Sequence, residues 1–313
     1  MPMKSLRRIL VATDFSGYAN VAVRRAAMLA HRHCCMLDLL QVVGWLPLET
    51  LKRLIDDHAL ETGQHLVDSF RDRLKTLADL LRSHYSVTVD HGVRLGRPHL
   101  EINAHATDHH ADLVVLGAHG EHFLQDGLLG TTTARVLRTG NHPVLIVRAE
   151  EPAPYRKILV PVDFSAASRG ALAWALAIES QAAIHVLHAV EVPFEGSLRD
   201  AGVPEELTQR LRAEALDQAR ARLDEFIEKT AGAEAGRITR RVEYGYPPKV
   251  ISDQSWLLRP DLIVVGKHGE AEKDAALLGS VTKHVIYEAD CDVLVVADEA
   301  PASLGSNTHS PQT

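Results

Sequence analysis

The stretch from Asp112 to Gly120 reads Asp-Leu-Val-Val-Leu-Gly-Ala-His-Gly, and nine residues later Gly130 to Thr133 read Gly-Thr-Thr-Thr. The apolar run predicts a short buried strand, and the hydroxyl-rich stretch predicts the start of a helix. Glycines between a strand and a helix let backbone N–H groups approach a ligand closely, and the helix start adds unpaired N–H groups. The stretch is therefore typical of a phosphate-binding loop.

The same stretch occurs a second time. Asp261 to Gly269 read Asp-Leu-Ile-Val-Val-Gly-Lys-His-Gly, and nine residues later Gly279 to Thr282 read Gly-Ser-Val-Thr. A single copy of so loose a spacing would equally suit a glycine turn that only lets a strand pack on a helix. Two copies in similar surroundings favour the binding function.

The repetition extends over most of the chain. Residues 8–16 read RILVATDFS and residues 157–165 read KILVPVDFS, a separation of 149 positions. The same separation relates Gly96 to Gly245, and it relates the glycines of the two loops. The chain is therefore a tandem duplication of a unit of about 145 residues, and not an array of short repeats.

Strand and helix patterns alternate within each unit. In the first unit we expect strands at 9–13, 36–43, 86–93, 113–116 and 144–147, with helices after residue 16 and over 47–83, 98–106 and 131–138. In the second unit we expect strands at 158–162, 185–190, 238–244, 262–265 and 293–296, and a long helix over 204–229. Such alternation gives a parallel sheet covered by helices, with ligands bound beyond the carboxyl ends of the strands.

Length and composition restrict the function classes. The 313 residues are 46% hydrophobic, which is enough for two domains with their own cores. A net charge of −7 argues against nucleic acid as the main partner. No apolar run approaches a membrane span and no export signal is evident, so we expect a cytoplasmic protein without membrane association. The three cysteines, Cys34, Cys35 and Cys291, fit neither a disulfide framework nor a zinc motif.

Five separated features occur in the same order in each half. They are a first strand ending in Val-x-x-Asp-Phe-Ser, an internal Gly-x-Pro, the Asp-Leu-x-Val strand, the Gly-x-His-Gly loop and the Gly-Ser/Thr helix start. This combination resembles the universal stress protein family over about residues 4–148 and 154–297, as a tandem member. The expected fold is α/β, with two repeated doubly wound domains, each a five-stranded parallel sheet of strand order 3-2-1-4-5 with helices on both faces. We expect domains at 1–149 and 150–300 and a disordered tail at 301–313.

The resemblance implies two ATP sites, with magnesium as a candidate companion ion. An aspartate after the first strand would lie near the ribose, the backbone of the second strand would contact the adenine, and the glycine loop would hold the phosphates. The first site would use Asp14, Val42, Leu116, Gly117, His119, Gly120, Gly130, Thr131 and Thr133. The second site would use Asp163, Ala189, Val265, Gly266, His268, Gly269, Gly279, Ser280 and Thr282.

Several residues admit a second interpretation. Asp14 and Asp163 could be helix caps, and both roles can coexist. The loop of the second site carries Glu270, Glu272 and Asp274, whose charges would repel a triphosphate, so the first site is expected to bind nucleotide more tightly.

A group of histidines near the end of one expected helix also invites two interpretations. His105 and His109, four residues apart, together with His110 and Asp108, could look like a metal cluster. A solvated helix end is the favoured reading, and no metal site is expected.

The expected function is regulatory. The chain has no Gly-x4-Gly-Lys-Ser/Thr loop, no Ser-His-Asp arrangement and no cation recurring in both loops, so we expect ATP binding with no or slow hydrolysis. Two alternatives stay open: an ATP-independent dimerisation or interaction module, and an ATP-dependent hydrolase or adenylyl transferase. The resemblance further implies that the two halves pair through their final strands, and whether two chains also form a homodimer stays open.

Overall fold

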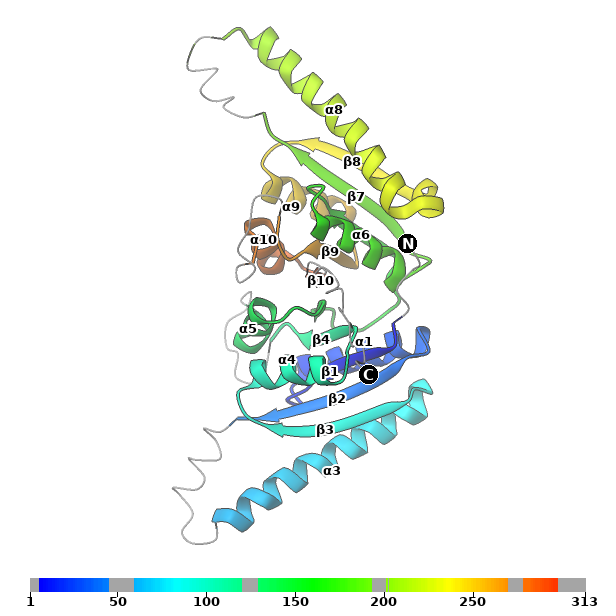
Figure 1. Ribbon diagram of the computed structural model, residues 1–313, viewed down its shortest axis with the longest axis vertical. Coiled ribbons are helices and arrows are strands. Elements are labelled where there is room, and N and C mark those ends of the chain that lie inside the picture. Colours follow the sequence, from blue (N-terminus) through cyan, green and yellow to red (C-terminus); the bar gives the residue numbers. More distant parts are fainter. Residues whose placement is uncertain are drawn as a thin grey trace, which may run out of the picture.

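The computed structural model describes residues 6–44, 59–119, 129–192, 201, 203–269 and 278–297. Its centre is a ten-stranded sheet of order β3-β2-β1-β4-β5-β10-β9-β6-β7-β8 (Figure 1). The strands are β1 (Arg8–Ala12), β2 (Met36–Val43), β3 (Val89–Leu95), β4 (Leu113–Gly117), β5 (Val144–Val147), β6 (Lys157–Pro161), β7 (Ala183–Val190), β8 (Ile238–Tyr244), β9 (Leu262–Gly266) and β10 (Asp292–Val296).

The sheet consists of two equivalent halves, which we call the first lobe (β1–β5) and the second lobe (β6–β10). Within each lobe all strand pairs are parallel and the order is 3-2-1-4-5, as the family resemblance implies. The lobes join where β5 and β10 pair antiparallel, with Leu145 opposite Leu294. The two final strands therefore cover each other's edges, which confirms the expected intramolecular pairing.

Helices cover both faces of the sheet (Figure 1). They are α1 (Gly17–Arg32), α3 (Ala59–Tyr85), α4 (Pro98–Asp108), α5 (Thr131–Thr139), α6 (Ala166–Ile178), α8 (Glu205–Ala231), a short 3-10 helix η1 (Gly232–Arg237), α9 (Pro247–Leu258) and α10 (Ser280–Glu288). In the first lobe α1 and α3 pack on one face and α4 and α5 on the other, and α6, α8, α9 and α10 repeat this arrangement in the second lobe.

Side chains alternate between these two faces along each strand. In β1, Ile9 and Val11 belong to the core under α1 and α3, whereas Leu10 belongs to the core under α4 and α5. Because both faces are buried in the middle of the sheet, central strands such as β4 and β5 are continuous apolar runs, whereas the outer strands β3 and β8 also carry charged residues. Asp38 interrupts the run in β2 and faces the same side as Leu40, toward α4.

The second strands of the two lobes are related by 147 positions instead of 149. The backbone N–H of Thr13 donates to the carbonyl of Leu40 at 2.9 Å, and that of Val162 donates to Leu187 at 2.8 Å. A shift of two residues keeps every side chain on its face. Asp38 therefore corresponds to His185, since each pairs with the third residue of its lobe's first strand.

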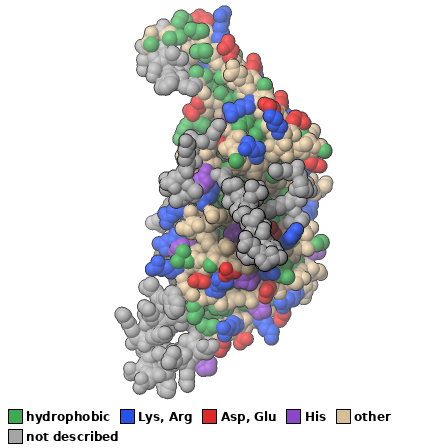
Figure 2. All heavy atoms as spheres, in the orientation of Figure 1, with side chains coloured by type: hydrophobic (Ala, Val, Ile, Leu, Met, Phe, Trp, Pro, Cys, Tyr) green, Lys and Arg blue, Asp and Glu red, His purple; other side chains and the backbone are tan. Residues whose placement is uncertain are grey.

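Charged side chains of both signs are interspersed on the face of the molecule that Figure 2 shows. Within the part of the chain that the structure describes, no helix has the length and apolar composition needed to cross a membrane.

Candidate functional site

The predicted site residues gather at the carboxyl ends of the central strands. β1 and β4 are neighbours in the first lobe, and β6 and β9 are neighbours in the second. The acid after the first strand and the glycine loop after the fourth strand therefore lie at one edge of the sheet in each lobe, as expected.

In the second lobe this edge is hollowed into a cavity of about 360 Å³. All nine residues that the sequence assigns to the second site line it: Asp163, Ala189, Val265, Gly266, His268, Gly269, Gly279, Ser280 and Thr282. Small-molecule sites commonly span about 300–1,000 Å³, so the cavity lies near the lower end of that range. Eight further residues that were not predicted also line it: Pro161, Val162, Ser168, Leu187, His188, Pro247, Ile251 and Val281.

Each glycine loop closes on itself before its helix starts. The N–H of Gly130 donates to the carbonyl of Ala118 at 2.8 Å, and that of Gly279 donates to Lys267 at 3.0 Å. The two glycines are the N-cap residues of α5 and α10, and neither helix start has a side-chain cap. The first turns of these helices therefore present backbone N–H groups, the usual donors to an anion.

The predicted hydroxyls divide into two kinds. Thr133 donates to the carbonyl of Gly117 at 3.0 Å, and Thr282 donates to Gly266 at 2.6 Å. These two threonines are buried, and their protons hold the loop to the helix instead of pointing to a ligand. Thr131 and Ser280, at the first position of each helix, are exposed.

The two aspartates brace the turns in which they lie. Asp14 Oδ1 accepts the N–H of Ser16, and Asp163 Oδ1 accepts that of Ser165, both at 3.0 Å. The serines, and not the aspartates, are the N-cap residues of α1 and α6. The aspartates therefore stabilise the turn before each helix and do not cap the helix. A Cβ atom on Gly269 would lie 2.9 Å from Asp163 Oδ2. The loop backbone therefore lies so close to this carboxylate that a side chain at position 269 would displace it.

The residue after each aspartate has an unusual backbone. Phe15 has φ 63° and Phe164 has φ 70°, in the left-handed region that aromatic residues rarely adopt. Strain of this kind persists where the surroundings impose it, often at functional sites. Arg73 lies over the Phe15 ring at 4.0 Å and Arg222 over the Phe164 ring at 4.3 Å. The repeated Asp-Phe-Ser was the only sequence signal for this turn.

The two lobes differ in the residues beside the glycine loop. In the first lobe the Tyr18 ring packs edge-on against His119, with ring centroids 5.0 Å apart. The second lobe has Ala167 at the position equivalent to Tyr18. It also has Ser168, whose hydroxyl donates to Asp163 Oδ1 at 2.6 Å.

Lys267 lies within the second glycine loop but reaches away from it. Its side chain is buried, and Nζ donates to the carbonyl of Gly140 at 2.8 Å, at the C-terminal end of α5 in the first lobe. A cation is favourable at that end of a helix dipole. The ammonium group therefore links the lobes.

His268 lines the second cavity, and its Nδ1 is buried without a hydrogen bond to any residue that the structure describes. Such an atom carries a desolvation cost that a bound polar ligand would remove. Gly120, Glu270, Glu272 and Asp274 lie outside the described residues.

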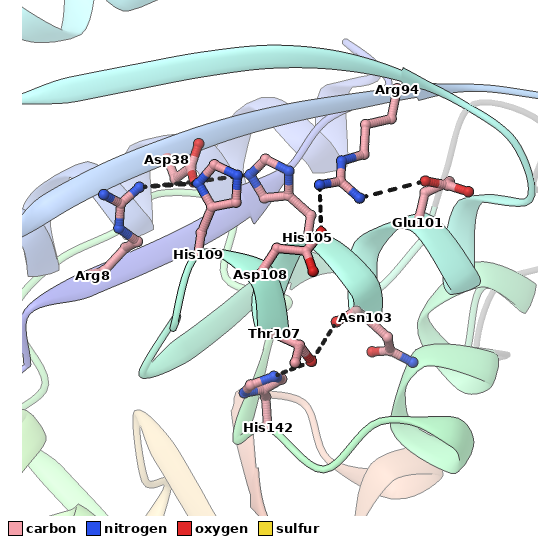
Figure 3. Close-up of polar contacts among 10 residues, drawn as sticks. All are labelled: Arg8, Asp38, Arg94, Glu101, Asn103, His105, Thr107, Asp108, His109 and His142. Atoms are coloured by element: carbon pink, nitrogen blue, oxygen red, sulfur yellow. Dashed lines mark hydrogen bonds and ion pairs between the residues drawn. The ribbon is translucent and has the colours of Figure 1, made fainter.

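The expectation of a solvated helix end is confirmed for Asp108 and His110, which are exposed, but it is wrong for His105. His105 is only 5% exposed, and its Nε2 lies 2.9 Å from Asp38 Oδ2 in β2 (Figure 3). Asp108, which the sequence grouped with it, turns away and pairs with Arg94 at 2.8 Å. One feature of the sequence could have indicated this contact: an acid in the middle of an apolar strand requires a buried partner.

Comparison with known proteins follows the same two lobes. The sequence model described as the Universal stress protein family matches residues 5–148 and again residues 154–297. A universal stress protein of Mycolicibacterium smegmatis is 28% identical over 309 residues, covering 92% of this chain and 96% of that protein. A universal stress protein of Mycobacterium tuberculosis is 30% identical over 318 residues, covering 93% and 96%.

Two solved structures share the fold along nearly their full length. A functionally unknown protein from Pseudomonas aeruginosa aligns with a TM-score of 0.65 at 22% identity, covering 95% of this chain and 94% of that one. A universal stress protein from Archaeoglobus fulgidus aligns with a TM-score of 0.66 at 19% identity, covering 93% and 98%.

Proposed function

Since the chain belongs to the universal stress protein family, with two family domains in tandem, we propose that it is a regulatory stress-response protein that binds adenine nucleotide in the cavity of the second lobe. The observation that carries the proposal is that nine residues chosen from the sequence line one cavity. Nucleotide binding would shift an equilibrium between conformations that a partner reads.

The chemistry of the cavity walls suits the parts of an adenine nucleotide. The apolar side chains of Ala189, Ile251 and Val265 offer a surface for a base. The carboxylate of Asp163 is an acceptor for ribose hydroxyls. The N-terminus of α10, with the exposed hydroxyl of Ser280, offers donors for phosphates, and a helix dipole adds about 0.3–1 kcal/mol.

We propose that hydrolysis is absent or slow. Phosphoryl transfer needs cationic groups that stabilise the transferring phosphoryl. Lys267 is the one Lys or Arg among the described residues of the two glycine loops, and its ammonium is bound to the other lobe. Steady-state turnover above a few per minute that is abolished by Asp163→Ala would contradict this part of the proposal.

The first experiment is to denature purified protein and identify the small molecules that it releases. ATP affinity is then measured by calorimetry, with and without magnesium, for the wild type, Asp14→Ala, Asp163→Ala and the double variant. We expect Asp163→Ala to lose the second-lobe component and the double variant to lose all binding. GTP and cAMP serve as competitors. GTP tests whether the site selects the adenine base, and cAMP tests whether it requires the triphosphate.

The same titrations compare the two lobes. The charges of the two loops predict that the first site binds ATP more tightly than the second. If so, Asp14→Ala lowers the ATP affinity of the chain more than Asp163→Ala does. Wild-type protein that releases no nucleotide and shows neither binding heat nor a thermal shift with ATP would instead favour the ATP-independent interaction module.

A further inference from the structure

A cluster of three side chains lies on the α4 face of the first lobe, away from the nucleotide cavity of the second lobe. Asp38 Oδ2 is 2.9 Å from His105 Nε2 and 3.4 Å from His109 Nδ1, and the three atoms all lie within 4.8 Å of one another. Figure 3 shows both rings directed toward the carboxylate. The two rings are stacked, with centroids 3.9 Å apart.

These spacings suit a shared metal ion. Zinc binds histidine nitrogen and carboxylate oxygen at about 2.0–2.2 Å, which separates neighbouring ligand atoms by about 3.3 Å in a tetrahedron. Histidines four residues apart project from the same side of a helix, and His109 follows directly on the last residue of α4. Two imidazoles and one carboxylate leave a coordination position open.

The cluster is accessible from one side. Asp38 is 1% exposed, but the His109 side chain is 35% exposed, so an ion has a path to the ligands.

The cluster lies at the opposite edge of the sheet from the predicted nucleotide sites. Arg8 is the first residue of β1 and Asp38 is the third residue of β2, whereas the glycine loops follow the carboxyl ends of the strands. The two lobes also differ here. The positions equivalent to Asp38, His105 and His109 hold His185, Gln254 and Leu258, so the second lobe does not repeat the ligand set.

We propose that Asp38, His105 and His109 form a binding site for one divalent transition-metal ion of the zinc class, present in the first lobe alone. The site is independent of the proposed nucleotide function. Arg8 is its internal competitor, because its Nη1 lies 3.2 Å from Asp38 Oδ2 and its side chain is 23% exposed. An arriving cation displaces the guanidinium toward solvent.

The site is expected to exchange its ion. Metal-bound histidines normally donate their second N–H to a partner, and losing such a partner costs about 10–100-fold in affinity. His105 Nδ1 is buried and has no hydrogen-bond partner among the described residues. Affinity in the micromolar range therefore fits the geometry better than the affinity of a permanent structural zinc.

The test uses the untagged full chain, freed of metal with a chelator. Zn²⁺ is titrated in competition with a chromogenic chelator, and Co²⁺ is added separately because its visible absorption reports a four-coordinate site. We expect one Zn²⁺ per chain for the wild type and at least tenfold weaker binding for His109→Gln. His110→Gln, an exposed histidine one residue further along, is the matched control and is expected to bind like the wild type.

A second variant keeps all three ligands. Arg8→Gln removes the competing guanidinium and is expected to tighten Zn²⁺ binding at least threefold. If the histidines and Arg8 only balanced the charge of Asp38 and bound no metal, this substitution would not tighten Zn²⁺ binding. Circular dichroism checks that each variant is folded. Equal Zn²⁺ affinity of the wild type and His109→Gln, or weaker binding by Arg8→Gln, would overturn the proposal. ATP affinity measured on the same variants is expected to stay at the wild-type value, which separates this result from the nucleotide experiment.

Discussion

Arg25 in α1 donates from Nε to the carboxylate of Asp292 in β10 at 3.0 Å, although 267 positions separate the two residues. Both side chains are buried. The same carboxylate accepts the hydroxyl of Tyr155 at 2.7 Å and the N–H groups of Arg148 and Ala149 at 2.8 and 3.0 Å. Asp292 therefore ties a helix of the first lobe and the segment between the lobes to β10, the final strand of the second lobe.

Asp292→Asn is expected to loosen this junction. The substitution removes the charge that balances a buried guanidinium, and breaking a buried ion pair costs about 3–5 kcal/mol. The urea midpoint of unfolding should fall accordingly. Asp290→Asn, a change at an exposed position two residues earlier, is the control and should shift the unfolding free energy by less than about 0.5 kcal/mol. Equal midpoints for the two variants would show that the junction does not depend on this charge.

The thiols should react in two classes. Cys34 is exposed, whereas burial raises the pKa of Cys35 to about 11 and that of Cys291 to about 12. Since the thiolate is the reactive form, a thiol reagent at pH 8 should modify one cysteine rapidly and the other two only after unfolding. Cys34→Ser should remove the rapid phase. Two rapid equivalents in the native wild type would contradict the burial of the other cysteines.

Tyr155 should make stability sensitive to alkaline pH. Burial, and then the neighbouring charge of Asp292, raise the pKa of this phenol well above 10.0. The unfolded chain loses the proton near pH 10 while the folded chain keeps it, so the contribution is present below pH 10 and is lost as pH rises further. Urea midpoints from pH 7 to 11 should fall more steeply above pH 10 for the wild type than for Tyr155→Phe. Parallel curves would mean that the phenol ionises equally in both states.

The alternation of strands and helices was predictable from a repeated pattern of apolar runs, whereas the strand order and the pairing of the lobes were expected from the resemblance to the universal stress protein family. Contacts between distant positions were not predictable in the same way. The approach of His105 to Asp38 depends on how α4 packs on β2, and the reach of Lys267 to Gly140 depends on how the lobes meet. Neither contact leaves a periodic signal, although an acid inside an apolar strand indicated that some partner exists.

The candidate nucleotide site was predictable as a set of positions but not in its details. The glycine loop and the family resemblance together gave nine of the residues that line the second cavity. The buried direction of the Thr282 hydroxyl and the contribution of Ser168 depend on hydrogen bonds that form only after folding. The difference between Tyr18 and Ala167 is visible in the sequence. Its consequence, the contact of the Tyr18 ring with His119 in the first lobe alone, is visible only in the structure.

Gly269→Ala tests the proposed nucleotide site without removing a polar group. The added Cβ would lie 2.9 Å from Asp163 Oδ2, so the carboxylate must turn away from its place in the cavity. A side-chain end moves easily, and we expect the thermal unfolding midpoint to change little. ATP affinity of the second lobe, measured in an Asp14→Ala background, should fall about tenfold, which corresponds to about 1.4 kcal/mol.

The matched control for this change is Gly236→Ala in η1, where an added Cβ meets no atom within 4 Å. It should leave both the unfolding midpoint and the ATP affinity at their reference values. If Gly269→Ala binds ATP as tightly as the control while Asp163→Ala abolishes binding, the carboxylate acts on the nucleotide from a position that the loop does not restrict. If Gly269→Ala and Asp163→Ala both bind ATP with the affinity of the Gly236→Ala control, the phosphates do not lie between Asp163 and the start of α10. A ligand bound there would contact the displaced carboxylate.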